Sequence, residues 1–114
     1  MSRTTLFVYG TLKSGMSHHY YLHGQEFVGA RQTLPRYRLH ACGWHPALVE
    51  ETAGAAIQGE LWRVDAQALA ALDRFEGAQF QRRQIAVEGF LEPVEAYYYL
   101  GDVAGLRDCG TSWP

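Results

Sequence analysis

Seven short segments with the composition of β-strands, set beside one strong helical segment, constrain the fold of this 114-residue chain more than any other feature. Glycine, proline or charged residues separate the strand-like segments. Seven short strands need protection of their edges, which favours a sheet that curls on itself. We therefore predict a single α+β domain over residues 1–114, a small mixed β-barrel with short flanking helices. The predicted strands cover residues 6–9, 26–33, 37–41, 48–50, 58–64, 82–88 and 94–100.

The predicted helix covers residues 66–75, a segment rich in alanine and leucine. Asp65 precedes it and is a good N-cap residue. Leu69, Leu72 and Phe75 recur every three residues and form one apolar face. Gly77 is placed to end the helix. A shorter helix is predicted over residues 17–23.

Composition excludes several classes of function. Hydrophobic residues make up 47% of the chain and charged residues 19%, which allows a packed core, and the formal net charge is −2. No basic stripe predicts binding to nucleic acid, and no apolar run reaches the ~18 residues that a membrane-spanning helix requires. The first residues lack the apolar core of a signal peptide. We therefore expect a cytoplasmic protein without a membrane partner, with Cys42 and Cys109 reduced.

The segment after the first predicted strand has the character of a binding loop. Gly10 and Gly15 bracket a short polar stretch that contains Thr11. A glycine lets another group approach the backbone closely, and successive N–H groups of such a turn can point at an anion. The alternative is an ordinary turn after a strand.

Glu76 lies at the end of the predicted helix, where the helix dipole disfavours a negative charge. This field, together with burial behind Phe75, would raise the pKa of Glu76 above its ordinary value of about 4.3. A carboxyl group with a raised pKa suits general acid–base catalysis near neutral pH. A solvated glutamate at a frayed helix end is the alternative, and Asp73 is a competing carboxylate.

The histidines and cysteines offer two further hypotheses. His19 and His23 are spaced as metal ligands on a helix, with His18 beside them, but no local Glu or Cys completes a set. We predict a solvated polar patch and no metal. Cys42 and His45 could pair as nucleophile and base, although no third orienting residue is evident.

Two segments near the end of the chain add candidate contacts. Strand alternation places Tyr97 and Tyr99 on one face, where their hydroxyls could line a pocket, although core packing is a common alternative. One of Arg82 and Arg83 should point inward and would need a partner such as Glu76 or Asp73.

In several of these segments the chain resembles the gamma-glutamylcyclotransferase-like superfamily, and within it the gamma-glutamylamine cyclotransferase and bacterial AIG2-like branch. The matching blocks occur in order with similar spacing and cover nearly the whole chain. Phe80 stands where the family often has tyrosine. The blocks are Phe7-Val8-Tyr9-Gly10-Thr11-Leu12-Lys13, Gly59-Glu60-Leu61-Trp62-Arg63-Val64-Asp65, Leu72-Asp73-Arg74-Phe75-Glu76-Gly77, Phe80-Gln81-Arg82, residues 96–99, and the tail from Gly105-Leu106 to Ser112-Trp113.

The resemblance implies a cofactor-free cyclotransferase that converts a small gamma-glutamyl amine or amide to 5-oxoproline and a free amine. It implies Glu76 as the catalytic acid and base. A non-catalytic metabolite-binding protein on the same fold, or a hydrolase of gamma-glutamyl amides, are the alternatives. The expected substrate contacts are Tyr9, Gly10, Thr11, Leu12, Arg82 and Tyr99.

Overall fold

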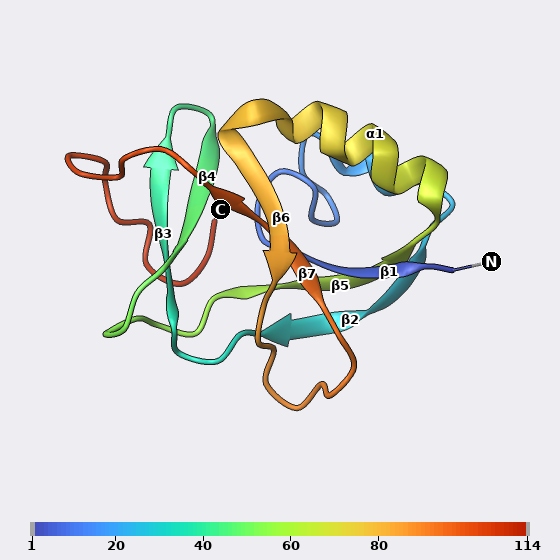
Figure 1. Ribbon diagram of the computed structural model, residues 1–114, viewed down its shortest axis with the longest axis horizontal. Helices are drawn as coiled ribbons and strands as arrows, with labels where there is room; N and C mark the ends of the chain where they lie inside the picture. Colours follow the sequence, from blue (N-terminus) through green and yellow to red (C-terminus); the bar gives the residue numbers. More distant parts are fainter. Residues whose placement is uncertain (1, 114) are drawn as a thin grey trace.

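A five-stranded sheet forms the centre of the structure (Figure 1). The structure is a computed structural model that describes residues 2–113. The order of its strands is β2-β5-β1-β7-β6, and β1 runs antiparallel to β5 but parallel to β7. A separate two-stranded ribbon consists of β3 (Tyr37–Cys42) and β4 (His45–Glu50). The strands of the large sheet are β1 (Thr4–Val8), β2 (Glu26–Gln32), β5 (Gln58–Val64), β6 (Phe80–Gln84) and β7 (Glu95–Tyr99).

The helix α1 (Ala66–Glu76) follows β5, begins at the predicted residue and ends one residue later than predicted. An Asp65 carboxylate oxygen accepts a hydrogen bond of 2.8 Å from the N–H of Ala68 at the first turn. At the other end, the Gly77 N–H donates to the carbonyl of Asp73. A 3₁₀ turn, η2 (Gly77–Gln79), leads into β6, and the predicted helix over residues 17–23 is a shorter 3₁₀ turn, η1 (His19–Leu22).

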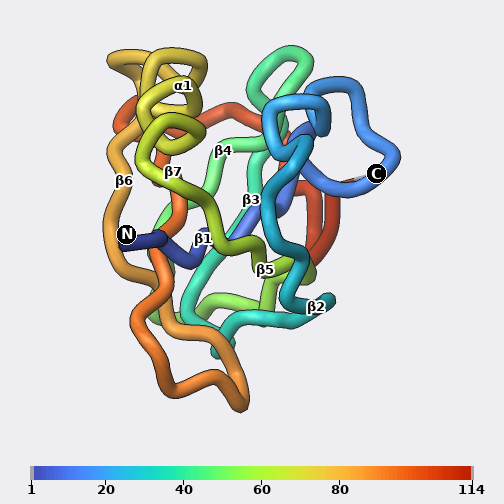
Figure 2. The backbone as a smooth tube through the Cα atoms, turned by 90° about the vertical axis from the view of Figure 1, so that its right-hand side faces the viewer, coloured from blue at the N-terminus to red at the C-terminus, as the bar shows by residue number. Residues whose placement is uncertain are grey.

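The two faces of the sheet are buried by different elements. Along β1, Leu6 and Val8 belong to the apolar cluster that includes Leu72 of α1. The alternate residues, Phe7 and Tyr9, belong to the cluster that includes residues of the ribbon. Figure 2 shows α1 and the tip of the ribbon at the same end of the molecule. The buried ribbon residues in this second cluster are Tyr37, Leu39 and Leu48.

The prediction of an α+β fold is confirmed, but the sheet does not close into a barrel. Within the described residues, the edge strands β2 and β6 do not pair with each other, and the ribbon shares no ladder with the large sheet. The sheet curls far enough for the segments after β2 and β6 to meet at one end. There the Leu34 N–H donates to the Ala86 carbonyl and the Glu88 N–H donates to the Gln32 carbonyl, both at 3.0 Å.

The remaining predicted strands are found with shifted ends. The strand predicted over residues 82–88 starts at Phe80 and ends at Gln84, because the chain then leaves the ladder and makes only an isolated bridge at Val87. Tyr98 is buried on the ribbon side of β7 and Tyr97 on the helix side, as alternation requires. Cys42 and Cys109 are both free thiols. Between residues 2 and 113, no helix has the length and apolar character needed to cross a membrane.

Candidate active site

The segment that follows β1 forms one wall of a cavity, and Tyr9 stands at its start. The buried Tyr9 hydroxyl donates a hydrogen bond of 2.6 Å to the carbonyl oxygen of Tyr97 on β7. Burial raises the pKa of Tyr9 well above its ordinary value, and the nearby charge of Glu76 adds to the rise. Tyr9 therefore keeps its proton at neutral pH and fixes the start of the loop to the sheet.

Gly10 lies against the ribbon so closely that no larger residue fits without movement. A Cβ atom added at Gly10 would lie 2.6 Å from Cγ and 2.9 Å from Cδ of Pro46 on β4. Outside the strand ladders of the described chain, no acceptor receives a hydrogen bond from the N–H of Gly10, Thr11 or Leu12. All three residues line the cavity, and the N–H groups of such a loop can serve an anionic ligand.

The carbonyl groups of the same loop are held by the segment that follows it. The His18 N–H donates to the carbonyl of Thr11 at 2.9 Å. The ring nitrogen Nδ1 of His19 lies 2.8 Å from the carbonyl oxygen of Leu12. These bonds fix the conformation of the loop, and they assign His18 and His19 a structural role that the sequence did not indicate. Residues 2–113 contain no cluster of three or more potential metal ligands.

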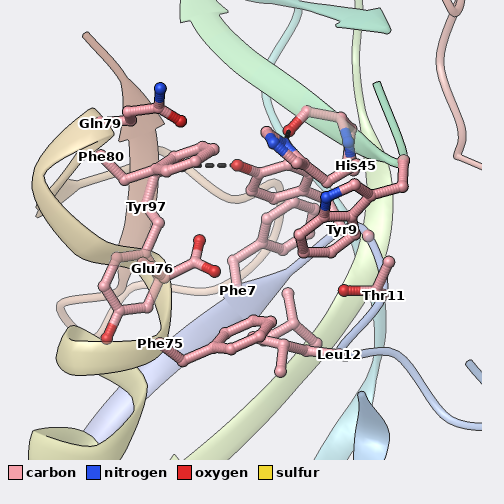
Figure 3. A pocket seen from close by; sticks show the side chains of 14 residues that line it. Phe7, Tyr9, Thr11, Leu12, His45, Phe75, Glu76, Gln79, Phe80 and Tyr97 are labelled. Atoms are coloured by element: carbon pink, nitrogen blue, oxygen red, sulfur yellow. Dashed lines mark hydrogen bonds between the residues drawn. The ribbon is translucent and has the colours of Figure 1, made fainter. Parts of the chain in front are cut away.

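Glu76 is the last residue of α1 and directs its carboxyl group into the cavity, between Phe75 and Tyr97 (Figure 3). Burial raises the pKa of Glu76 from 4.5 to about 7. No described cation forms an ion pair with this carboxyl group. The carboxyl group therefore divides between its acidic and basic forms near neutral pH, which is the condition that general acid–base catalysis requires.

The competing carboxylate, Asp73, is fully engaged outside the cavity. Arg82 donates to both of its oxygens, at 3.0 and 3.1 Å, and the Tyr97 hydroxyl donates to Oδ1 at 2.6 Å. The hydrogen bonds from Arg82 are the main cause that lowers the pKa of Asp73. Asp73 thus stays ionised and is occupied as an acceptor, whereas Glu76 is the carboxyl group in the cavity.

The cavity has a volume of about 240 Å³ and lies where the loop after β1, the end of α1 and the tip of the ribbon meet. Its wall is largely aromatic and aliphatic. Among residues 2–113, Glu76 is the only one that brings a carboxyl group to the wall, and none brings a lysine, arginine or cysteine side chain. The lining residues are Phe7, Val8, Tyr9, Gly10, Thr11, Leu12, Trp44, His45, Pro46, Phe75, Glu76, Gln79, Phe80 and Tyr97.

Comparison with known proteins assigns this chain to a family. A family described as "Gamma-glutamyl cyclotransferase, AIG2-like" matches residues 6–113. The chain belongs to this family.

Individual relatives agree with the assignment. A bovine gamma-glutamylaminecyclotransferase is 38% identical over 106 residues, which cover 82% of this chain and 63% of the relative. A Vibrio cholerae protein, provisionally named a gamma-glutamylcyclotransferase, is 39% identical over 83 residues, which cover 73% of this chain and 70% of the relative. The crystal structure of an AIG2-like protein from Mus musculus superposes with a TM-score of 0.80 at 27% identity, covering 97% of this chain and 88% of that one. The expectation of a cyclotransferase-type enzyme is thereby confirmed at the level of the family.

The family resemblance also predicted substrate contacts at Arg82 and Tyr99, and neither residue lines the cavity. Arg82 is drawn away by its ion pairs with Asp73 and Glu95. The Tyr99 hydroxyl instead accepts a hydrogen bond of 3.7 Å from the thiol of Cys42. The prediction that an inward arginine would need a carboxylate partner is confirmed by the pair of Arg82 with Asp73.

Sequence reasoning missed the contribution of the ribbon to the site. Trp44, His45 and Pro46 lie at and after the β3–β4 turn and line the cavity. His45 was considered only as a base for Cys42, and no local pattern marks Trp44 or Pro46, because the ribbon meets the loop after β1 only through packing on the sheet. Cys42, considered as a nucleophile, is not among the lining residues.

Proposed function

We propose that this protein is a cofactor-free gamma-glutamyl cyclotransferase, which converts a small gamma-glutamyl amine or amide to 5-oxoproline and a free amine. The observation that carries the proposal is Glu76. Its carboxyl group has a pKa of about 7 and faces a cavity beside the N–H groups of the loop after β1.

The reaction is an intramolecular acyl transfer. The α-amine of the substrate attacks the γ-carbonyl carbon, so that a new C–N bond closes the five-membered ring. The bond between that carbon and the leaving nitrogen then breaks. The nucleophile is tethered to its target, and the gain from proximity is therefore large.

Glu76 serves both proton transfers in turn. As a carboxylate it accepts a proton from the attacking α-ammonium group, and as a carboxylic acid it returns a proton to the leaving nitrogen. A pKa of about 7 keeps both forms of Glu76 accessible near neutral pH. The α-nitrogen must lose two protons to become the lactam N–H, and the leaving nitrogen must gain two to depart as an ammonium group. Glu76 therefore makes this transfer twice and ends in its carboxylate form.

The loop after β1 supplies the anion-binding part of the site. The N–H groups of Gly10, Thr11 and Leu12 are proposed to bind the α-carboxylate of the substrate, because no lysine or arginine among residues 2–113 lines the cavity. Tyr9 is proposed to position the loop through its bond to the Tyr97 carbonyl. Arg82 is proposed to act indirectly, by holding Asp73 and hence the Tyr97 side chain that lines the cavity.

The decisive experiment replaces Glu76 by glutamine, which keeps the shape of the side chain and removes its proton transfer. Glu76→Gln is expected to lower kcat by roughly 10² to 10⁴, the usual contribution of general acid–base catalysis, with the fold intact. The assay measures 5-oxoproline released from a panel of gamma-glutamyl amides. Glu51→Gln, which changes an exposed carboxylate outside the cavity, is the matched control and should keep wild-type activity.

The product separates the proposed reaction from its alternatives. Release of glutamate in place of 5-oxoproline would identify a hydrolase. Binding of gamma-glutamyl compounds without turnover would identify a metabolite-binding protein. A Glu76→Gln variant with activity close to wild type would refute the mechanism.

A further inference from the structure

Three rings form a cluster beside the candidate active site, and we call Trp44, His18 and Phe75 the aromatic collar. The His18 ring centroid lies 5.1 Å from that of Trp44 and 4.8 Å from that of Phe75. The Trp44 and Phe75 centroids are 6.3 Å apart. Trp44 lines the cavity and yet keeps 61% of its surface exposed, so it stands at the mouth.

The backbone holds each ring of the collar close to the residues proposed to perform the chemistry. Trp44 follows Gly43 in a two-residue turn that joins β3 to β4. Gly43 has a φ of +64°, which suits a glycine in the first position of such a turn and fixes the direction in which Trp44 projects. His18 is bonded through its N–H to Thr11, and Phe75 directly precedes Glu76.

The location of the collar determines which part of a substrate it would meet. If the α-carboxylate lies on the loop N–H groups and Glu76 protonates the leaving nitrogen, the rest of the leaving amine must extend from Glu76 toward solvent. Phe75 and Trp44 line the cavity on that route. Their rings offer apolar faces, and the part of the wall that the structure describes has no lysine or arginine to pair with a carboxylate on the leaving amine.

We infer that the aromatic collar is the subsite for the leaving amine, and that it selects gamma-glutamyl amides whose amine carries an apolar ring over those whose amine is small or bears a carboxylate. This inference rests on the proposed function, since it uses the orientation that the reaction imposes. Stacking of a ring against an aromatic side chain adds to the gain from burial of that ring, so the preference should reach roughly tenfold.

The test compares three compounds that share the gamma-glutamyl group: the benzylamide, the methylamide and gamma-glutamylglycine. We expect kcat/KM for 5-oxoproline formation to be roughly tenfold higher for the benzylamide than for the methylamide, with gamma-glutamylglycine no better than the methylamide. In Trp44→Ala, the ratio of kcat/KM for the benzylamide to that for the methylamide should fall to a value between about 1 and about 3. Trp44→Phe keeps a ring face and should retain most of the ratio.

Binding measurements keep this test independent of turnover. On Glu76→Gln, calorimetry should show roughly tenfold tighter binding of the benzylamide than of the methylamide. Phe27→Ala removes another exposed ring, on β2 and outside the cavity, and should leave both ratios unchanged.

The outcomes separate the two proposals. If none of the three compounds yields 5-oxoproline, the proposed function is refuted. The ratio of the benzylamide and methylamide affinities measured by calorimetry would then test the aromatic collar as a binding site by itself. Equal binding of the benzylamide and methylamide, a preference for gamma-glutamylglycine, or a benzylamide preference that survives in folded Trp44→Ala would overturn the collar as the leaving-amine subsite.

Discussion

Replacing Glu76 by glutamine should stabilise the protein at alkaline pH and have little effect at acidic pH. Burial raises the pKa of this carboxyl group from 4.5 to about 7, so the folded state holds the proton more tightly than the unfolded chain does. Between these two values the folded protein binds more protons, and the free energy of unfolding therefore falls as the pH rises. The penalty is absent below the unfolded value and complete above the folded one.

The size of the effect follows from the shift. A difference between 4.5 and about 7 corresponds to roughly 3 kcal/mol of lost stability once Glu76 is fully ionised. Glutamine does not titrate and resembles the protonated acid in shape and charge. The variant should therefore match wild type near pH 4.5 and exceed it by roughly 2–3 kcal/mol at pH 8, or about 10 °C in Tm.

The assay is urea denaturation of both proteins at half-unit intervals from pH 4.5 to 8.5, with the difference in free energy of unfolding plotted against pH. Three aspartates whose pKa is lowered contribute the opposite dependence, but they are common to both proteins and cancel: Asp65, Asp73 and Asp108. Glu51→Gln should stay within about 0.5 kcal/mol of wild type throughout. A difference curve for Glu76→Gln that is flat across this range, or that turns negative at pH 8, would refute the assignment of a buried, proton-retaining carboxyl group.

Two further predictions concern the loop after β1 and the histidines. Gly10→Ala should raise KM for a gamma-glutamyl substrate by at least tenfold with the fold retained, because the new Cβ would displace the loop from Pro46. A folded Gly10→Ala variant with the wild-type KM would show that the contact is unimportant. Addition of a chelator should leave the melting temperature unchanged, because His18 and His19 serve loop and ring contacts; a fall of several degrees would mean that the histidines hold a structural metal.

Local signals sufficed for the secondary structure and for part of the site. The Asp65 cap and Gly77 defined the helix α1 because both act on neighbouring backbone groups. Strand-like composition between glycine, proline and charged residues located each strand within a few residues. The sequence also placed Glu76 at a helix end, and the structure agrees because that position depends only on helix length.

What the sequence could not supply were the features that depend on distant packing. A closed barrel was predicted, but closure requires β2 and β6 to share a ladder, and that depends on how far the sheet curls. Arg82 was correctly expected to need a carboxylate. However, strand alternation gives only the face of the sheet, and it does not say that the pairing with Asp73 would keep Arg82 out of the cavity. The ribbon contributes to the cavity through its packing on the large sheet, and strand alternation does not predict that contact either.

The short turn between β3 and β4 has a consequence for how such a protein could change over time or be redesigned. The Glu76 carboxyl group and the loop after β1 belong to elements joined to the large sheet, whereas Trp44 sits on a separate ribbon and is exposed. Substitutions at this tip can therefore accumulate without disturbing the core beneath it. A library confined to Gly43 and Trp44, or to one or two inserted residues between them, would sample new preferences for the leaving amine while leaving the reactive centre in its original scaffold.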